Sequence, residues 1–425
     1  MSAELKSAGE IDIQLVEIIG SSGRSLDIRN QILSINIFEN IFSPFITGTI
    51  LVKDSMELIN FFPLSGEETL NIRLATPGYT DKGTYIDNRF FIYKVSDWDE
   101  LAERSSTYTL NFISVEAIMD LNLKISKSFN DSVGNIANRI LTDFSFNSDK
   151  TRIHVEPTLN SHTYVSNFWT PVQNLNYLAE RAVNLNGSPT FLFFENRNGL
   201  NFISMESLYN SSVYQSFYGN NYHRDVNPDG TSVRNIENEY KAIIDITIPS
   251  IFDYVDRIRS GAFASTLITH DLTTKRYGFI EFDFLDEYDK ETRLNQFPLT
   301  SKKAPHYNTS AIKSLNKSTS LFSGGNDITG SRYFQRRKSL LALAESCKVN
   351  ITVLGRTDYT VGQKVYLDLS KNMVITKEDT DVKDHMFSGN YIVSSIKHVI
   401  TRDLHQIEME LMKDSLDLDL NNIKT

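Results

Sequence analysis

Apolar and polar residues alternate along the first part of the chain, which is the pattern of half-buried β-strands. The segments that show it are residues 11–18, 32–40, 45–52, 68–76, 89–99 and 106–116. A short helical turn is expected at 54–62, and residues 100–105 predict the turn of a long hairpin. Because closure removes exposed sheet edges, we expect residues 1–116 to form a first antiparallel β-barrel.

Helical periodicity replaces the alternation after residue 116. Apolar residues at helical spacing predict two helices, through Val133, Ile136, Ile140 and Leu141 and through Val172, Leu175, Leu178 and Ala182. Thr170 followed by Pro171 predicts the start of the second helix, and Asn186–Gly187 predicts its end. Two strands about the turn 196–199 follow. Residues 117–235 are therefore a predicted α+β connecting domain, in which the Tyr, Asn, Ser and Gly-rich segment 208–235 is a surface loop.

Strand patterns return in the second half of the chain. They cover residues 239–250, 261–272, 347–355, 363–370 and the closing pair 388–415, which turns at Arg402–Asp403. We expect a second barrel from 236–275 with 345–416, a helical and loop-rich insertion at 276–344, and a flexible tail at 417–425. The predicted fold class is thus mixed and β-rich (α+β), with two antiparallel β-barrels.

Charge and composition narrow the function classes. The chain has 425 residues with 43 basic and 53 acidic side chains, which gives a net charge of −10. Such an acidic chain is a poor candidate for holding nucleic acid phosphates on a basic face. Because the sequence has neither a long apolar stretch nor the apolar core of a signal peptide, we expect no membrane insertion.

Catalytic and cofactor motifs are hard to find in this sequence. The eight histidines include no pair at the helical spacing of a zinc protease, and no glycine-rich phosphate loop or serine nucleophile motif occurs. His398 and His405 lie in the closing strands, where we interpret them as side chains on the strand surface. Cys347, the single cysteine, is expected to be a buried structural thiol. No cofactor, metal or catalytic residue is therefore predicted.

One segment imitates a calcium loop. Asp225, Asn227 and Asp229 supply oxygens at positions one, three and five, and Gly230 follows. Position twelve is Ile236 rather than a bidentate glutamate, so a plain surface turn is favoured and cation binding is left open.

Two further features permit other functions. Carboxylates that could serve glycoside hydrolysis cluster at Asp97, Asp99 and Glu100, at Asp283, Asp286 and Glu287, and at Glu378, Asp379 and Asp381. Sequence proximity does not supply the required geometry, and solvated loops are the favoured interpretation. Trp98 and Trp169 could stack on a sugar, although packing is the commoner role.

Three stretches, in their order, resemble the baseplate hub protein of contractile-tailed bacteriophages, which is similar to the N-terminal part of type VI secretion spike proteins. They are the helix and hairpin of 171–204, the closing strands of 388–415, and the run INIFENIFSPFITGTILVKDS at 35–55. Residues 208–235 and 276–330 depart from the family pattern, so their role stays open.

The resemblance implies a structural protein of the virion tail, assembled in the host cytoplasm. Each subunit would carry two tail-tube-like barrels, and a homotrimer would form a ring between the hexameric tail tube protein and the trimeric central spike protein, in contact with other baseplate proteins. DNA would pass through its channel without specific binding, past acidic or uncharged side chains. The alternatives are a tail-associated cell-wall hydrolase and a carbohydrate- or receptor-binding tail protein.

Overall fold

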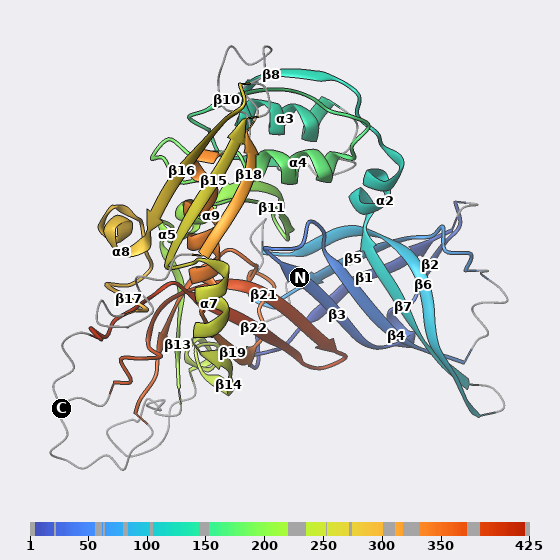
Figure 1. Cartoon of the computed structure of the whole chain (residues 1–425). Coiled ribbons are helices and arrows are strands. Elements are labelled where there is room, and N and C mark those ends of the chain that lie inside the picture. Colours follow the sequence, from blue (N-terminus) through green and yellow to red (C-terminus); the bar gives the residue numbers. More distant parts are fainter. Residues whose placement is uncertain are drawn as a thin grey trace, which may run out of the picture.

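The fold is known from a computed structural model. It describes residues 5–20, 23–55, 62, 64–79, 84–102, 105–143, 153–219, 235–251, 253–271, 274–300, 311–317, 331–371 and 383–420. These residues form a β-rich α+β molecule, which confirms the predicted class. Figure 1 shows two strand-rich halves side by side, with helices and smaller sheets above one of them. The predicted cation loop Asp225–Gly230 lies outside the described residues, as do residues 56–61 of the expected helical turn.

The first half confirms the strand pattern of the N-terminal residues. Its elements are β1 (Asp12–Ile19), β2 (Ser25–Asp27), η1 (Arg29–Gln31), β3 (Ile32–Asn40), β4 (Thr47–Asp54), β5 (Thr69–Ala75), β6 (Ile86–Ala102) and β7 (Ser105–Ser114). The alternating residues, such as Ile35, Ile37, Ile50 and Leu110, point into one apolar core. The predicted long hairpin is β6–β7.

The second half is built from strands that lie far apart in the sequence. They are β13 (Val213–Tyr218), β14 (Ile243–Ile251), β19 (Cys347–Leu354), β20 (Lys364–Asp368), β21 (Gly389–Thr401) and β22 (His405–Lys413). The predicted closing pair is β21–β22. A short ladder joins β17 (Phe297–Pro298) to β23 (Ser415–Leu416).

One thirteen-stranded sheet of the described residues joins the two halves. Its main path runs β14-β19-β22-β21-β3-β4-β7-β6-β5-β1-β2, with β13 and β20 branching from β21. In the described part of the chain no ladder closes either half into a barrel, contrary to the two closed barrels expected. In the first half, the edge of β3 that closure would use instead pairs with the later residues of the long strand β21, whose first residues pair with β20. In the second half, β13 and β14 form no ladder with each other among the described residues, so that half stays open as well.

The two apolar cores are interlocked at this junction. Ile400, at the end of β21, is buried in the core of the first half. Ile41, just after β3, is buried in the core of the second half. Each half thus completes the core of the other.

A connecting unit packs against the second half. Its elements are α2 (Val115–Asn122), β8 (Ser128–Ser132), α3 (Val133–Asp143), β9 (Ile153–Val155), β10 (Ser161–Val165), α4 (Pro171–Ala179), β11 (Phe191–Asn196), β12 (Gly199–Ser204) and α5 (Met205–Tyr209). The predicted start of α4 is confirmed by a capping box between Thr170 and Gln173. The helix ends at Ala179, before the predicted Gly187. The Asn184 side chain accepts backbone N–H bonds from Asn186 and Ser188, which favours turns over helix there.

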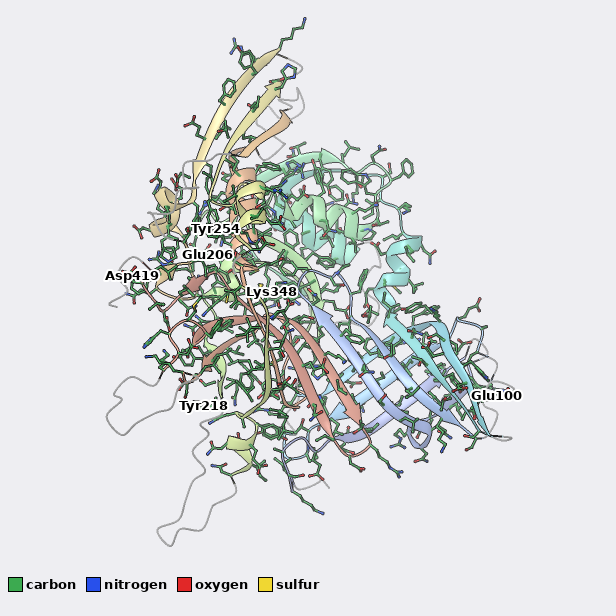
Figure 2. The ribbon with its side chains drawn as sticks, turned by 60° about the horizontal axis from the view of Figure 1, so that its bottom comes forward. Glu100, Glu206, Tyr218, Tyr254, Lys348 and Asp419 are labelled. Carbon is green, nitrogen blue, oxygen red and sulfur yellow. The ribbon has the colours of Figure 1, made fainter. Side chains whose placement is uncertain are left out.

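The remaining elements form a small unit of their own. They are α7 (Tyr254–Ser260), β15 (Ala264–Asp271), β16 (Arg276–Asp283), α8 (Phe284–Glu287), η2 (Tyr288–Lys290), β18 (Ala311–Lys317) and α9 (Ser331–Ala344). The short helix α6 (Ile236–Glu239) lies instead beside the first half, where the Tyr79 hydroxyl donates to Glu237. We expected β15 in the second barrel, but it pairs with β16 and β18 in a separate sheet that projects from the molecule (Figure 2). Strands also occur in both segments predicted as loops, since β13 lies within 208–235 and β16 and β18 within 276–330. No helix among the described residues has the length and apolar character to cross a membrane.

Candidate functional face of the central sheet

The candidate functional site is the side of the large sheet that points away from the two cores, which we call the polar face. Register pairs place its residues on adjacent strands, because Asn350 lies opposite Glu410, Asn36 opposite Thr49 and Thr49 opposite Asn111. From β19 to β6 the face carries Lys348, Asn350, Thr352, Glu408, Glu410, Ser395, Lys397, Val399, Ser34, Asn36, Phe38, Thr47, Thr49, Leu51, Lys53, Thr107, Thr109, Asn111, Lys94 and Ser96. It therefore crosses both halves without interruption, and most of its side chains are uncharged and polar.

Two lysines of this face lie beside glutamates, whereas two others, Lys53 and Lys94, are exposed. Lys397 Nζ lies 3.1 Å from a carboxylate oxygen of Glu408 on the neighbouring strand. Lys348, at the start of β19 and labelled in Figure 2, lies 3.2 Å from Glu410. Such partly exposed pairs add little stability, at most about 1 kcal/mol each. They do cancel the positive field that each lysine would otherwise present.

Among the described residues, two of the unpaired edges of the sheet belong to β14 and to the outer part of β6. β14 pairs only with β19 among the described residues, and Ile244, Ile246 and Ile248 on it are 51%, 37% and 37% exposed. β6 runs past the end of its ladder with β5, so residues 93–102 pair only with β7, and Tyr93 and Trp98 are each 50% exposed. Unpaired edges with exposed apolar side chains are typical of surfaces that another chain covers.

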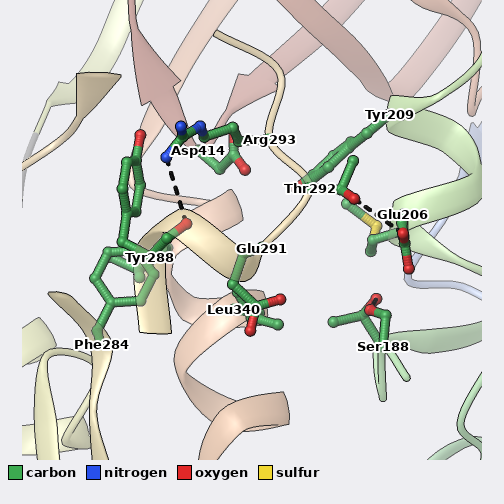
Figure 3. A pocket seen from close by; sticks show the side chains of 13 residues that line it. Ser188, Glu206, Tyr209, Phe284, Tyr288, Glu291, Thr292, Arg293, Leu340 and Asp414 are labelled. Atoms are coloured by element: carbon green, nitrogen blue, oxygen red, sulfur yellow. Dashed lines mark hydrogen bonds between the residues drawn. The ribbon is translucent and has the colours of Figure 1, made fainter. Parts of the chain in front are cut away.

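A small pocket is the second candidate site (Figure 3). It lies among α5, α8, α9 and the end of β22. Its carboxylates already have partners: Glu206 accepts bonds from Asn184 at 2.6 Å and Thr292 at 2.9 Å, and Asp414 accepts one from the Leu294 backbone at 3.1 Å. Burial raises the pKa of Asp414. The pocket is therefore a hydrogen-bonded junction between α5, the segment 291–294 and the end of β22.

The carboxylate clusters considered for hydrolysis stay apart. Asp97, Asp99 and Glu100 are exposed on β6, and Glu100 lies at the outer end of the hairpin (Figure 2). Asp283 accepts the Leu285 N–H at the start of α8, and Glu287 pairs with Lys290. Glu378, Asp379 and Asp381 lie outside the described residues. Within the described ranges, no three His, Cys, Asp or Glu side chains converge as they would around a metal ion.

Other singled-out residues are in packed positions. Trp98 stacks on Tyr108 with ring centroids 5.0 Å apart, and Trp169 packs against Tyr177. Cys347 is buried and free, as predicted. His398 and His405 were interpreted as strand-surface residues, and this is wrong, because both side chains are completely buried.

The polar face is the feature that sequence reasoning did not find. The signal was present in the outward-facing residues of each alternating strand, for example in Ser34 and Asn36, which alternate with Ile35 and Ile37. What the alternation could not show is that strands from both ends of the chain share one sheet.

Comparison with known proteins finds one related sequence and several proteins of similar fold. No family model matches the chain. Over 444 residues it is 22% identical to the probable baseplate hub protein gp334 of Vibrio phage KVP40 (isolate Vibrio parahaemolyticus/Japan/Matsuzaki/1991), with 97% of each chain covered. The fold is similar to that of a tail protein from Neisseria meningitidis MC58, with a TM-score of 0.53, 12% identity and 94% and 96% of the two chains covered. It is also similar to that of the 43 kDa tail protein of prophage MuSo2 from Shewanella oneidensis, with a TM-score of 0.55, 10% identity and 95% and 99% covered. The resemblance predicted from three stretches of sequence is thereby confirmed.

Proposed function

We propose that this phage tail baseplate hub protein forms a ring of three copies that joins the hexameric tail tube to the trimeric central spike, with the polar face lining the DNA channel. The observation that carries the proposal is that one continuous sheet presents both halves of the chain on a single face. Two strand-rich halves in each of three copies would match a sixfold tube on one side and a threefold spike on the other.

The chemistry of the polar face supports a channel. DNA that must slide past a wall is held back by each unpaired lysine or arginine, since each phosphate contact releases counterions and strengthens binding. Most of the face consists of Ser, Thr and Asn side chains, and Lys348 and Lys397 lie beside glutamates, so the phosphates meet few positive charges beyond the exposed Lys53 and Lys94.

The unpaired edges support a ring. β14 and residues 93–102 of β6 belong to different halves of the same sheet, so the edge of one copy can meet a different edge of the next. Such head-to-tail contacts generate closed rings when the rotation per copy fits a whole number of copies.

The proposed ring also assigns a role to each half of the chain and names its partners. The two halves act as two tail-tube-like units, with residues 1–116 in one and 345–416 supplying most of the other. The protein works by assembly and without an active site, in the baseplate of the virion tail. Its partners are the tail tube protein, the central spike protein and other baseplate proteins.

Sedimentation of the full chain at micromolar concentration, alone and with its spike partner, tests the ring. We expect a species of three copies, and we expect Ile246→Asp on the β14 edge to reduce it to the monomer while the circular dichroism spectrum is retained. The matched control is Val255→Asp, because Val255 is 59% exposed on α7 outside the sheet. A wild-type chain that stays monomeric with the spike partner present rejects the proposal.

A further inference from the structure

A buried cluster of polar side chains lies at the junction of the two halves, on the core side of the sheet. Its members are Glu39 of β3, Arg197 of the β11–β12 turn, Asp358 and Thr360 of the loop 355–363, and His398 and His405 of β21 and β22. Glu39 is 2% exposed and neither histidine has any exposed surface. We call this set the junction cluster.

The two histidines bind each other. Nδ1 of His398 and Nε2 of His405 are 3.0 Å apart, and the rings stack at 28° with centroids separated by 5.2 Å. Nε2 of His398 and Nδ1 of His405 are buried without a hydrogen-bond partner among the described residues. One neutral ring donates and the other accepts in such a bond, whereas two protonated rings have only donors. The contact therefore requires that at least one ring stays neutral.

The surroundings favour neutral rings. Burial lowers the pKa of His398 to about 3, with a further lowering from the Arg197 cation and an opposing effect of Asp358. Burial, and then the neighbouring His398, lowers the pKa of His405 well below its ordinary value. Oε1 of Glu39 is 3.9 Å from Nε2 of His398, and burial raises the pKa of this carboxyl group. These are the charged or titratable groups that face the pair from β3, the β11–β12 turn and the loop 355–363.

The same cluster holds the loop 355–363 in place. Thr360 donates its hydroxyl to Glu39 at 2.5 Å, and the Arg197 backbone N–H donates to Thr360 at 3.3 Å. The Gly355 N–H donates to the carbonyl of His405 at 2.8 Å, and a Cβ at Gly355 would lie only 2.3 Å from the His405 ring. The loop in turn binds the first half, where Thr357 exchanges hydrogen bonds with Thr76. A displaced His405 ring would therefore loosen the loop and, with it, the contact between the halves.

We propose that the His398–His405 pair is an acid-sensitive lock on the junction of the two halves. The lock is closed while the rings are neutral, and it opens, with release of the loop 355–363, when both rings take up protons. This inference concerns the single chain and does not depend on the proposed ring.

The pH window follows from the directions of the pKa shifts. The histidine pKa values are lower in the closed state than the ordinary 6.5, so the open state binds more protons and the closed state loses stability as the pH falls below about 6.5. Glu39 has a raised pKa in the closed state, so its neutral form favours closure at low pH and acts in the opposite direction. Opening in acid must therefore come from the histidines. Each proton taken up multiplies the opening equilibrium about tenfold per pH unit, and two protons multiply it about 100-fold.

Hydrogen exchange of the wild-type full chain, followed by mass spectrometry from pH 7.5 to 5 and corrected for intrinsic rates, tests the lock. We expect protection of residues 355–363 to fall about 100-fold per pH unit below about pH 6. Protection of the β4–β7 ladder should stay constant over that range. Constant protection at 355–363, or a fall shared by the β4–β7 ladder, rejects the proposal.

Variants separate the two rings from other acid effects. The double substitution His398→Gln and His405→Gln removes both titrating groups, and we expect it to abolish the pH dependence at 355–363. The matched control is His270→Gln, because His270 is exposed on β15, and it should leave the wild-type profile unchanged. If the double variant does not fold, the slope of the wild-type profile still decides, since a slope near zero contradicts a two-proton lock.

Discussion

At the scale of the residue, the position of the two buried histidines in the strand alternation predicts their burial better than their polarity does. His398 is two residues from both Ile396 and Ile400, and His405 is two residues before Ile407. Because alternate side chains of a strand share a face, both histidines are in phase with core residues. The interpretation as surface residues followed their polarity, whereas their phase predicts burial. Their partner Glu39 could not be predicted, because it comes from the other end of the chain.

Gly355 gives a prediction at the same scale. A methyl group at this position would lie 2.3 Å from the His405 ring, closer than packed atoms approach. We expect Gly355→Ala to lower the free energy of unfolding by about 3 kcal/mol, since overpacking of a tight core site costs this order of energy. Urea unfolding followed by circular dichroism measures the change.

The matched control for Gly355→Ala is Gly278→Ala in β16. The nearest atom to its added methyl group is the Thr269 hydroxyl oxygen at 3.2 Å, a side chain that can move slightly. Its cost should stay below about 1 kcal/mol. Equal losses in the two variants would contradict the close packing of His405 on Gly355.

At the scale of the element, the sequence predicts those helices and hairpins whose ends are determined by nearby turn and cap residues. The β6–β7 hairpin and the start of α4 follow from turn and cap residues that lie within a few positions of the element. β13 and β18 were predicted as loops, because their sequences are polar and their partners are remote. β13 pairs in parallel with β20, and β18 pairs in parallel with β15. Because parallel strands are joined by a long connection, no short turn sequence next to β13 or β18 indicates that these segments are strands.

The cap of α4 provides the prediction at this scale. The Thr170 hydroxyl accepts the Gln173 N–H at 3.2 Å, and the Gln173 side-chain oxygen accepts the Thr170 N–H at 3.0 Å. Thr170→Ala should therefore lower the free energy of unfolding by about 1 kcal/mol. Thr142→Ala, on the exposed side of α3, is the control and should change it by less than about 0.5 kcal/mol. Chemical denaturation of both variants makes the comparison, and a larger loss at Thr142 would show that the cap is unimportant.

At the scale of the whole molecule, the joining of the halves is the feature that no local pattern contains. Two strand-rich regions were predicted, and both are present, but the ladder between β3 and β21 turns them into one sheet. The same ladder brings polar residues from opposite ends of the chain together on the polar face. Strand pairing therefore decides which charges on this face lie side by side, as for Lys397 and its cross-strand neighbour Glu408.

The charges of the polar face predict whether the assembled protein binds duplex DNA. Wild-type protein should show no retention of duplex DNA in a gel-shift assay at about 0.15 M salt. Glu408→Gln together with Glu410→Gln leaves Lys397 without its partner and leaves Lys348 with only Glu345 at 4.0 Å. The two lysines freed in this way add to the exposed Lys53 and Lys94 of the face, so this variant should retain DNA, and retention should weaken steeply as salt is raised.

A change of net charge alone must not produce the same retention. Glu180→Gln together with Asp286→Asn removes two carboxylates at exposed positions of the connecting unit and of α8, away from the polar face. Both double variants carry the same net charge, so general attraction between protein and DNA is equal in the two. Only the variant on the polar face should shift the DNA band. Retention by the wild type, or equal retention by the two variants, would mean that the polar face is not the surface that DNA passes.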